Sequence, residues 1–296
     1  MRAIVLGSAA GGGFPQWNSN AEACRRARAG DPAARPRTQA SLAVAGDGPL
    51  WTLLNASPDL RQQIEATPEL HPATALRSSP IGAVVLTSGE VDCVAGLLNL
   101  RERQSFELFA TDRIHAVLDA NPIFNVLARD IVTRRVIALD EEVTLPGGVS
   151  LRLFSVAGKV ALYLEGHEEG ADGDTVGACL SHDGVTLFYV PACAAMTPAL
   201  ADRLRGADTV MFDGTLWRDD EMIRAGLGSK TGQRMGHMSV SGEGGAIQAL
   251  AELGIGRKIL LHINNSNPVL LDDSPERAAV ERAGWQVAFD GMRVAF

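Results

Sequence analysis

Cysteine is scarce in this chain, and its spacing suits neither zinc nor a disulfide framework. The 296 residues include four cysteines, at positions 24, 93, 179 and 193, and none of them forms a C-x-x-C pair. So few cysteines in so long a chain do not build a disulfide scaffold. We therefore expect a protein of the reducing cytoplasm.

The chain also lacks a long apolar run and a basic stripe. No stretch approaches the roughly 20 apolar residues of a membrane-spanning helix. The apolar start at residues 1–6 is short and leads into Gly11-Gly12-Gly13-Phe14-Pro15 without a cleavage site, so we expect no signal peptide. The 27 basic and 35 acidic residues give a net charge of −8. Nucleic acid and anionic membrane are therefore not expected partners, whereas an anionic small molecule remains compatible with a few focused cations.

What the chain does contain is the composition of a globular protein, with 46% hydrophobic and 21% charged residues. The first half predicts strands at 2–7, 40–45, 50–55, 82–87 and 106–110, and helices after Ser57-Pro58-Asp59, at 92–102 and at 112–120. The second half predicts strands at 149–156, 160–165, 176–181, 185–190, 208–213 and 258–263, helices at 197–205, 241–253 and 275–284, and terminal strands. Asp183-Gly184 predicts a hairpin turn.

Two strand-rich halves, each with helices that need an apolar surface to cover, predict two sheets packed face to face with helices outside. We expect this four-layer αββα sandwich to form a single α/β domain over residues 1–296. The segments 167–174 and 224–245 are expected to be surface loops over a site.

A glycine-rich segment follows the first predicted strand and has to be compared with phosphate-binding loops. Gly7 and Gly12 have the outer spacing of a P-loop, but Gly13-Phe14 stands where Lys and Ser/Thr would bind phosphate and magnesium. The G-x-G start of the dinucleotide fingerprint is also missing. Nucleotide binding is disfavoured, and two interpretations stay open: a tight backbone path beside another segment, or exposed N–H groups lining a pocket.

This segment, continued as Gln16-Trp17-Asn18, resembles the opening of the B proteins of pyrroloquinoline quinone synthesis, which have a metallo-β-lactamase fold. Further stretches that resemble this family follow in the same order, from residue 55 to residue 292: Asn55-Ala56-Ser57-Pro58-Asp59, Gly96 to Glu102, Asp213-Gly214-Thr215-Leu216-Trp217, Met235-Gly236-His237, His262 to Pro268, and Phe289-Asp290-Gly291-Met292. Each stretch is weak alone, but together they span nearly the whole chain.

The resemblance implies a metal site with a reduced ligand set. Hydrolytic members of the superfamily carry H-x-H-x-D-H after a strand; aligned on Asp92, this chain has Ser88 and Glu90 for the first two histidines and Cys93 for the last. The remaining candidates are Asp92, Cys93, Asp213 and His262, which could hold one zinc or ferrous ion. Their single histidine does not satisfy a 2-His-1-carboxylate iron triad.

Each candidate ligand also has a structural interpretation. Asp92 could cap a helix, Asp213-Gly214 could form a turn, and Cys93 could be a small buried side chain. His262 is the strongest ligand candidate, because it ends an apolar strand. A second set of histidines, His71, His115 and His182, is expected to be solvated, and His167 is a weaker candidate ligand in an acidic loop.

The family's relatives also carry a Cys-x-Cys-x-x-Cys zinc knuckle after Gln-Trp-Asn. This chain has Ser19, Ala21 and Cys24 at those positions. With two thiolates replaced, we expect no structural zinc there.

A late glycine-rich loop supplies candidate substrate contacts. Lys230, Arg234 and His237 could clamp carboxylates, although a solvated loop with scattered charge is an equal alternative. The resemblance implies a ligand that is pyrroloquinoline quinone, a fused aromatic tricarboxylate, or its precursor derived from cross-linked Glu and Tyr. Trp17 or Trp217 would suit either ring system, and Asn265 completes the expected binding set.

Two functions are therefore implied by the resemblance. In the first, Asp92, Asp213 and His262 are the catalytic residues of an iron-dependent hydroxylase that acts on the tyrosine ring of the precursor. In the second, a non-catalytic carrier retains the cofactor or its precursor and aids delivery toward the periplasm. The resemblance favours the hydroxylase and the missing imidazoles favour the carrier, while zinc-hydroxide hydrolysis is the least supported. A homodimer is compatible with either function.

Overall fold

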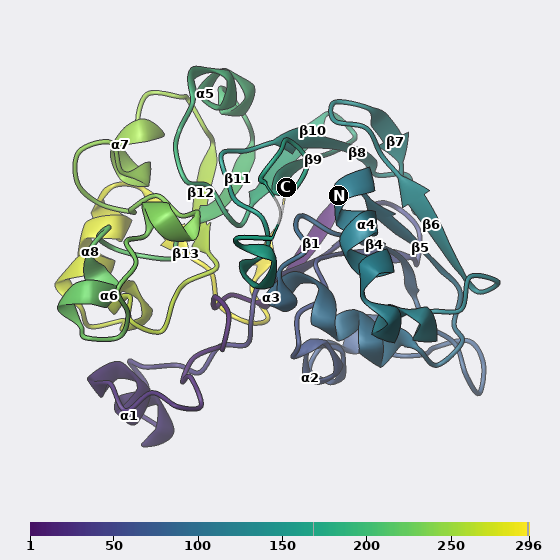
Figure 1. Cartoon of the computed structure of the whole chain (residues 1–296), viewed down its shortest axis with the longest axis horizontal. Helices are drawn as coiled ribbons and strands as arrows, with labels where there is room; N and C mark the ends of the chain where they lie inside the picture. Colours follow the sequence, from purple (N-terminus) through teal and green to yellow (C-terminus); the bar gives the residue numbers. More distant parts are fainter. Residues whose placement is uncertain (168, 295) are drawn as a thin grey trace.

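The computed structural model describes residues 1–167, 169–294 and 296 as two mixed sheets with helices on their outer faces (Figure 1). The first sheet has the order β14-β1-β2-β3-β4-β5-β6 and the second the order β13-β12-β11-β10-β9-β8-β7. The strands of the first sheet are β1 (Arg2–Gly7), β2 (Ser41–Ala45), β3 (Trp51–Leu54), β4 (Ile81–Val85), β5 (Phe106–Ala110), β6 (Val132–Val136) and β14 (Arg293–Val294). Those of the second are β7 (Glu142–Thr144), β8 (Ser150–Ser155), β9 (Val176–His182), β10 (Val185–Val190), β11 (Thr209–Asp213), β12 (Arg257–Leu261) and β13 (Trp285–Val287).

Alternation along the strands divides the apolar residues between two cores. In β11, Met211 packs in the core shared by the two sheets, whereas its neighbours Val210 and Phe212 pack in a second core outside the second sheet. Successive side chains of a strand point to opposite faces, so a sheet that is covered on both faces needs apolar residues at every position. This arrangement confirms the predicted four-layer αββα sandwich.

Helices cover the outer faces of both sheets. In Figure 1, α2 and α4 lie beside the first sheet, and α5, α7 and α8 lie beside the second. The helices are α1 (Glu22–Arg28), α2 (Leu60–Glu65), α3 (Val91–Val94), α4 (Asp112–Ala120), α5 (Pro198–Leu204), α6 (Glu221–Arg224), α7 (Ala246–Ala249) and α8 (Pro275–Arg282). Thr111, Thr197 and Ser274 cap α4, α5 and α8 by accepting a backbone N–H three residues on, which stabilises each first turn.

Several predicted elements were wrong in detail. Residues 160–165 form no strand but contain a short 3₁₀ turn, Leu162–Leu164. The predicted helix 241–253 is limited to α7, because Gly242 and Gly244 have φ of +85° and +70°, which a right-handed helix excludes. Ser57 does not cap α2, since the helix starts at Leu60 with Asp59 in the N-cap position. The strands β6 and β7 and the helix α1 were not predicted.

The glycine-rich segment joins the two sheets beside the strand ends. Ala9 forms a bridge to Gln39, just before β2 of the first sheet, and another to Ile263, just after β12 of the second. The backbone then turns through Gly12 and Gly13, whose φ values are +90° and +71°. The segment therefore follows a tight path and also reaches the strand ends where a site could form. No described helix is long and apolar enough to cross a membrane.

Candidate metal centre and ligand pocket

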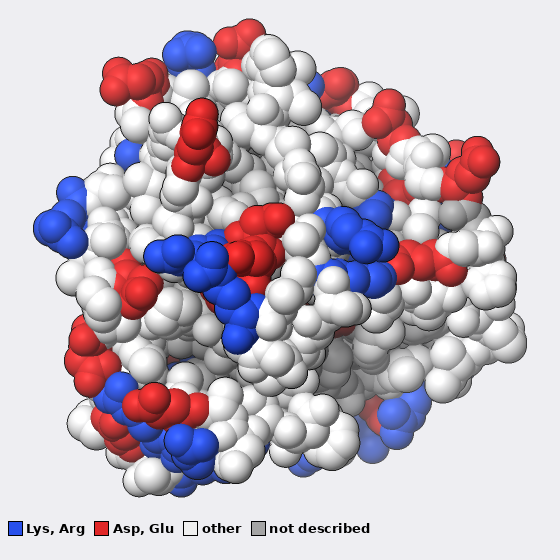
Figure 2. Space-filling view, turned by 60° about the vertical axis from the view of Figure 1, so that its left-hand side comes forward, with Lys and Arg blue, Asp and Glu red and all other residues white. Residues whose placement is uncertain are grey.

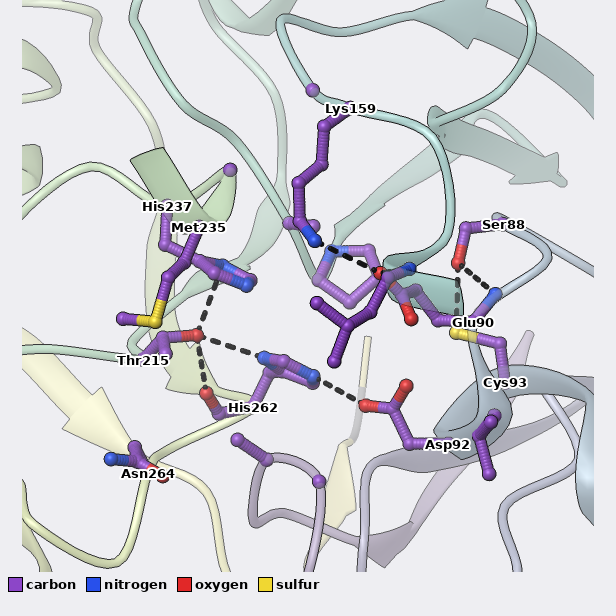
Figure 3. Close-up of a pocket in the computed structure, with 18 of the residues that line it drawn as sticks. Ser88, Glu90, Asp92, Cys93, Lys159, Thr215, Met235, His237, His262 and Asn264 are labelled. Atoms are coloured by element: carbon purple, nitrogen blue, oxygen red, sulfur yellow. Dashed lines mark hydrogen bonds and ion pairs between the residues drawn. The ribbon is translucent and has the colours of Figure 1, made fainter. Parts of the chain in front are cut away.

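A pocket of about 960 Å³ opens where β4, β11 and β12 end. Its wall includes residues 10–12, 87–88, 90–93, 158–159, 162–163, 228–230, 235–237, 262 and 264. The loop around residues 228–237 thus contributes to a site as predicted, whereas the described residues of 167–174 do not line it. Figure 3 shows the polar side chains that converge there.

Asp213 ends β11 and is completely buried. Its Oδ1 accepts hydrogen bonds from the backbone N–H and the hydroxyl of Thr215, at 3.0 and 2.6 Å. Its Oδ2 accepts one from the backbone N–H of Cys193 at 3.0 Å and lies 2.7 Å from Nδ1 of His237. The bonds within residues 213–215 are those of a turn, while the contact with His237 points to a metal-type donor set. Asp213 therefore forms the predicted turn and also lies in the candidate metal site.

Two histidines meet this carboxylate. One ligand atom from each of Asp213, His237 and His262 lies within 4.8 Å of the others, and the two imidazole rings stack with centroids 5.2 Å apart. This cluster contains two histidines, whereas the sequence predicted a site with one. His237, assigned from the sequence to a carboxylate-binding loop, lies among the candidate metal ligands.

His262 follows β12 directly and has a left-handed backbone, with φ +55°. This conformation is uncommon for residues other than glycine and is held by contacts on both sides of the ring. The Thr215 hydroxyl lies 2.8 Å from Nδ1, and Asp92 Oδ2 lies 2.8 Å from Nε2 (Figure 3). Thr215 also lies 3.1 Å from Nδ1 of His237, so one hydroxyl links both rings. Sequence reasoning missed this role, although Thr215 lies inside a stretch that resembles the family.

Asp92 is the second residue of α3 and is not its cap, because Glu90 occupies the N-cap position. Burial raises the pKa of Asp92, but the hydrogen bond and the charge of His262 outweigh burial and lower it overall. Burial likewise lowers the pKa of His262, and the hydrogen bond and charge of Asp92 raise it overall. The two groups form a buried pair in which the carboxylate orients the imidazole.

Cys93 is buried next to Asp92 and lines the pocket. The Ser88 hydroxyl donates to its sulfur at 3.3 Å. Burial and the charge of Asp92 raise the pKa of the thiol well above its usual range. A neutral thiol is a poor metal ligand, and Cys93 is not part of the three-residue donor group.

Two lysines stand at the mouth of the pocket and share one carboxylate. Glu165 Oε1 lies 2.6 Å from Lys159 Nζ, and Oε2 lies 2.5 Å from Lys230 Nζ. Hydrogen bonds from the two lysines lower the pKa of Glu165 to about 2. Lys159 also lies 3.4 Å from Glu90 Oε1. Lys230 was predicted as a binding residue, but Lys159 was missed because its segment carries no recognisable motif.

The loop that carries Lys159 and Glu165 is fastened to the loop after β4. The Tyr163 hydroxyl donates to the carbonyl of Gly89 at 2.7 Å, and the backbone N–H of Leu162 donates to Glu90 Oε1 at 3.0 Å. These contacts explain why the segment forms a short turn over the pocket and not a strand of the sheet.

The other predicted substrate contacts lie away from the pocket wall. Arg234 is exposed, Trp217 packs partly against the outer core, and Trp17 is 85% exposed. Asn265 is buried and contacts Gln16 and Cys24, and only its neighbour Asn264 lines the pocket. Basic and acidic side chains alternate across the face in Figure 2, without a continuous basic stripe.

The remaining histidines and cysteines take the following places. His71 and His167 are exposed. His115 was expected to be solvated but is 5% exposed, with Nε2 3.1 Å from the carbonyl of Arg135. The side chain of His182 is 9% exposed and was also expected to be solvated. Cys24 is a buried free thiol, and the Ser19 hydroxyl accepts a hydrogen bond from the backbone N–H of Ala21.

Comparison with known proteins identifies first the class and then the family. A family model described as a β-lactamase superfamily domain matches residues 50–263, which are most of the chain. The chain therefore belongs to the β-lactamase superfamily, and its two-sheet sandwich is the metallo-β-lactamase fold. A PhnP-family diphosphatase (TM-score 0.72, 21% identity, covering 100% of this chain and 98% of that chain) shares this fold.

Relatives of higher identity extend over the full length. Coenzyme PQQ synthesis protein B of Gluconacetobacter diazotrophicus is 61% identical over 98% of both chains, and that of Methylorubrum populi is 54% identical over 99% of both. The crystal structure of Zn²⁺-bound PqqB from Methylobacterium extorquens has a TM-score of 0.97 at 54% identity, with 100% of both chains covered. The chain belongs to the coenzyme PQQ synthesis protein B family.

Proposed function

We propose that this member of the family hydroxylates the tyrosine ring of a Glu–Tyr-derived precursor of pyrroloquinoline quinone, with one ferrous ion in the pocket. The observation that carries the proposal is the convergence of Asp213, His237 and His262. Two imidazoles and one carboxylate, with positions left for other ligands, are the donor set of non-haem iron oxygenases. The zinc in the Methylobacterium extorquens relative supports a divalent metal in this family.

The donor residues fit such an ion. The carboxylate of Asp213 and the ring of His237 already face each other at 2.7 Å, and their partners fix both groups before any ion binds. Asp213, His237 and His262 would hold the ion, and Asp92 would orient His262 through its ring nitrogen. Bound iron would supply oxygen activation at the pocket floor.

The reaction balances with an external reductant. One atom of O₂ would enter a ring C–H bond and turn the phenol into a dihydroxyphenyl ring, and the other would leave as water after taking up two electrons and two protons. The reaction therefore needs a two-electron reductant, which ascorbate can supply in the assay below. Val91, Leu162, Met222 and Met235 offer apolar surface for the ring.

Lys159 and Lys230 are the proposed contacts for the precursor's carboxylates. Both line the pocket, and both are held by Glu165. A carboxylate of the ligand would replace that of Glu165, so the lysines remain paired with an anion before and after binding. Glu165 thus marks the place that a ligand carboxylate would take.

A carrier remains the second candidate, because Ser88, Glu90 and Cys93 stand where hydrolytic relatives have histidines. Binding of the tricarboxylate cofactor by the two lysines needs no metal at all. A carrier would therefore bind pyrroloquinoline quinone equally well in metal-free and metal-loaded protein.

One experiment separates the two functions. Anaerobically purified protein is loaded with ferrous iron and given Glu–Tyr dipeptide, ascorbate and air, and the dihydroxyphenyl product is measured by mass spectrometry. We expect Asp92→Ala to lower product formation by about 10- to 100-fold, as loss of a partner that orients a ligand commonly does. Asp172→Asn, which changes an exposed carboxylate elsewhere, should have no effect. Wild-type protein that binds iron and dipeptide but forms no product would contradict the hydroxylase and leave the carrier.

A further inference from the structure

A second cluster of metal-type donors lies at the other end of the sheets from the pocket. Asp47 belongs to the turn between β2 and β3 of the first sheet. In the second sheet, His182 is the last residue of β9 and Asp183 begins the turn to β10. One ligand atom from each of the three residues lies within 4.8 Å of the others. The pocket residues Gln39 and Pro191 lie at the opposite ends of β2 and β10.

His182 points into this cluster with an unused nitrogen. Its side chain is 9% exposed, and its Nε2 lies 3.3 Å from Asp47 Oδ1 and 3.3 Å from Asp183 Oδ2. Within the described residues, this buried nitrogen has no well-formed hydrogen bond, and its contacts with Asp47 and Asp183, which are 85% and 75% exposed, are those of ion pairs. A buried imidazole nitrogen without a hydrogen bond is unfavourable unless another partner occupies its axis.

The other ring nitrogen is already committed. Nδ1 lies 3.1 Å from the carbonyl oxygen of Gly148, an acceptor that fixes the proton on Nδ1. In the neutral ring with its proton on Nδ1, Nε2 is the nitrogen that faces the two carboxylates. An imidazole that donates one N–H to a backbone carbonyl and offers its other nitrogen is the usual arrangement of a metal-binding histidine.

The distances are compatible with ligands of one ion. With metal–ligand bonds of about 2.0–2.2 Å, two neighbouring ligands of a tetrahedral zinc ion lie about 3.3–3.6 Å apart. Both nitrogen-to-oxygen separations, 3.3 Å, lie at the lower end of this range. The loops can come this close because residue 46 is glycine. A Cβ at this position would lie 2.2 Å from the carbonyl oxygen of Gly147.

We propose that Asp47, His182 and Asp183 bind one divalent transition-metal ion of the zinc type, which links the two sheets at the end opposite the pocket. One imidazole and two carboxylates, completed by water, suit zinc, cobalt or nickel. This proposal does not depend on the hydroxylase or on the carrier.

The test uses the full chain and zinc as the probe. The variant His182→Asn keeps an amide donor at the position of Nδ1, so the contact with Gly148 survives while Nε2 is lost. Zinc bound to chelator-treated protein is counted by mass spectrometry of the metal at pH 8. We expect wild type to bind one more equivalent than His182→Asn, and Asp183→Asn to weaken that equivalent at least tenfold.

Two controls separate this site from the pocket. Asp202→Asn, an exposed carboxylate on α5, should leave zinc binding unchanged. In His237→Ala, which disrupts the pocket donors, zinc should still raise the melting temperature, and this rise should vanish in His237→Ala/His182→Asn. Circular dichroism verifies that each variant is folded. Equal zinc content in wild type and His182→Asn would overturn the proposal, and the cluster would then be an ordinary ion-pair group.

Discussion

Replacing Glu165 with Gln is expected to tighten, not weaken, the binding of a carboxylate ligand. Glu165 contacts Lys159 at 2.6 Å and Lys230 at 2.5 Å, and the three side chains are 25–35% exposed. A ligand carboxylate that uses these lysines has to displace Glu165 from both. Glutamine keeps the size of the side chain but removes its charge. A ligand that enters the Glu165→Gln variant therefore has weaker contacts with the lysines to displace.

The size of the effect follows from the exposure of the two pairs. Partly exposed ion pairs contribute about 0.2–1 kcal/mol each, so displacing both costs the ligand about 0.4–2 kcal/mol. A factor of ten in affinity corresponds to about 1.4 kcal/mol, which predicts binding that is roughly 2- to 30-fold tighter in Glu165→Gln. The difference should shrink in 1 M salt, where the Debye length is about 3 Å.

The assay is calorimetric titration of pyrroloquinoline quinone into metal-free protein at low and high salt. Glu169→Gln serves as the matched control, because Glu169 is exposed and lies in the neighbouring segment. Affinity that is unchanged or weaker in Glu165→Gln would show that the two lysines do not hold the ligand carboxylates.

Three further predictions follow from the site and the core. His237→Ala should remove the metal of the pocket, measured as loss of one equivalent of iron from anaerobically loaded protein; retained iron would mean that other residues hold it. Lys159→Met should weaken binding of pyrroloquinoline quinone about 2- to 5-fold, whereas Arg234→Met should leave it unchanged. Weaker binding in Arg234→Met and unchanged binding in Lys159→Met would place the anion site on the exposed side of the loop. Burial lowers the pKa of His115 from 6.5, so the unfolded chain binds more protons than the folded chain in mild acid, and stability should fall as the pH drops below about 6.5. His115→Gln should reduce the fall in melting temperature between pH 7 and pH 5, and an identical fall in both proteins would refute this assignment.

The strands that build the site could be predicted because their residues are apolar on one or both faces. β11 and β12 are buried along most of their length, and their polar ends, Asp213 and His262, therefore stand out in the sequence. Asp92 was predicted from the family pattern, and its bond to His262 joins residues 170 positions apart. No local sequence pattern predicts a contact over this distance along the chain.

The histidine that completes the donor group could not be placed from the sequence. His237 lies in an irregular loop whose course depends on long-range bonds, such as that from the backbone N–H of Met238 to the carbonyl of Cys193 at 2.6 Å. Lys159 was missed for the same reason, since its loop has no period and is held by Glu90 and Tyr163. Both residues take their positions from tertiary contacts and not from local propensity.

The left-handed backbone of His262 has a consequence for attempts to make this protein more robust. A residue with a Cβ at φ +55° carries a conformational cost of about 1–2 kcal/mol that glycine would not. Glycine at this position would relieve that cost, but it would leave the buried Asp92 carboxylate without its imidazole partner, a loss that outweighs the gain. The contact of the ring with Thr215 would be lost as well, so relaxing the backbone here would not make the protein more stable. Attempts to stabilise this protein should therefore leave position 262 unchanged and draw substitutions from positions away from the pocket.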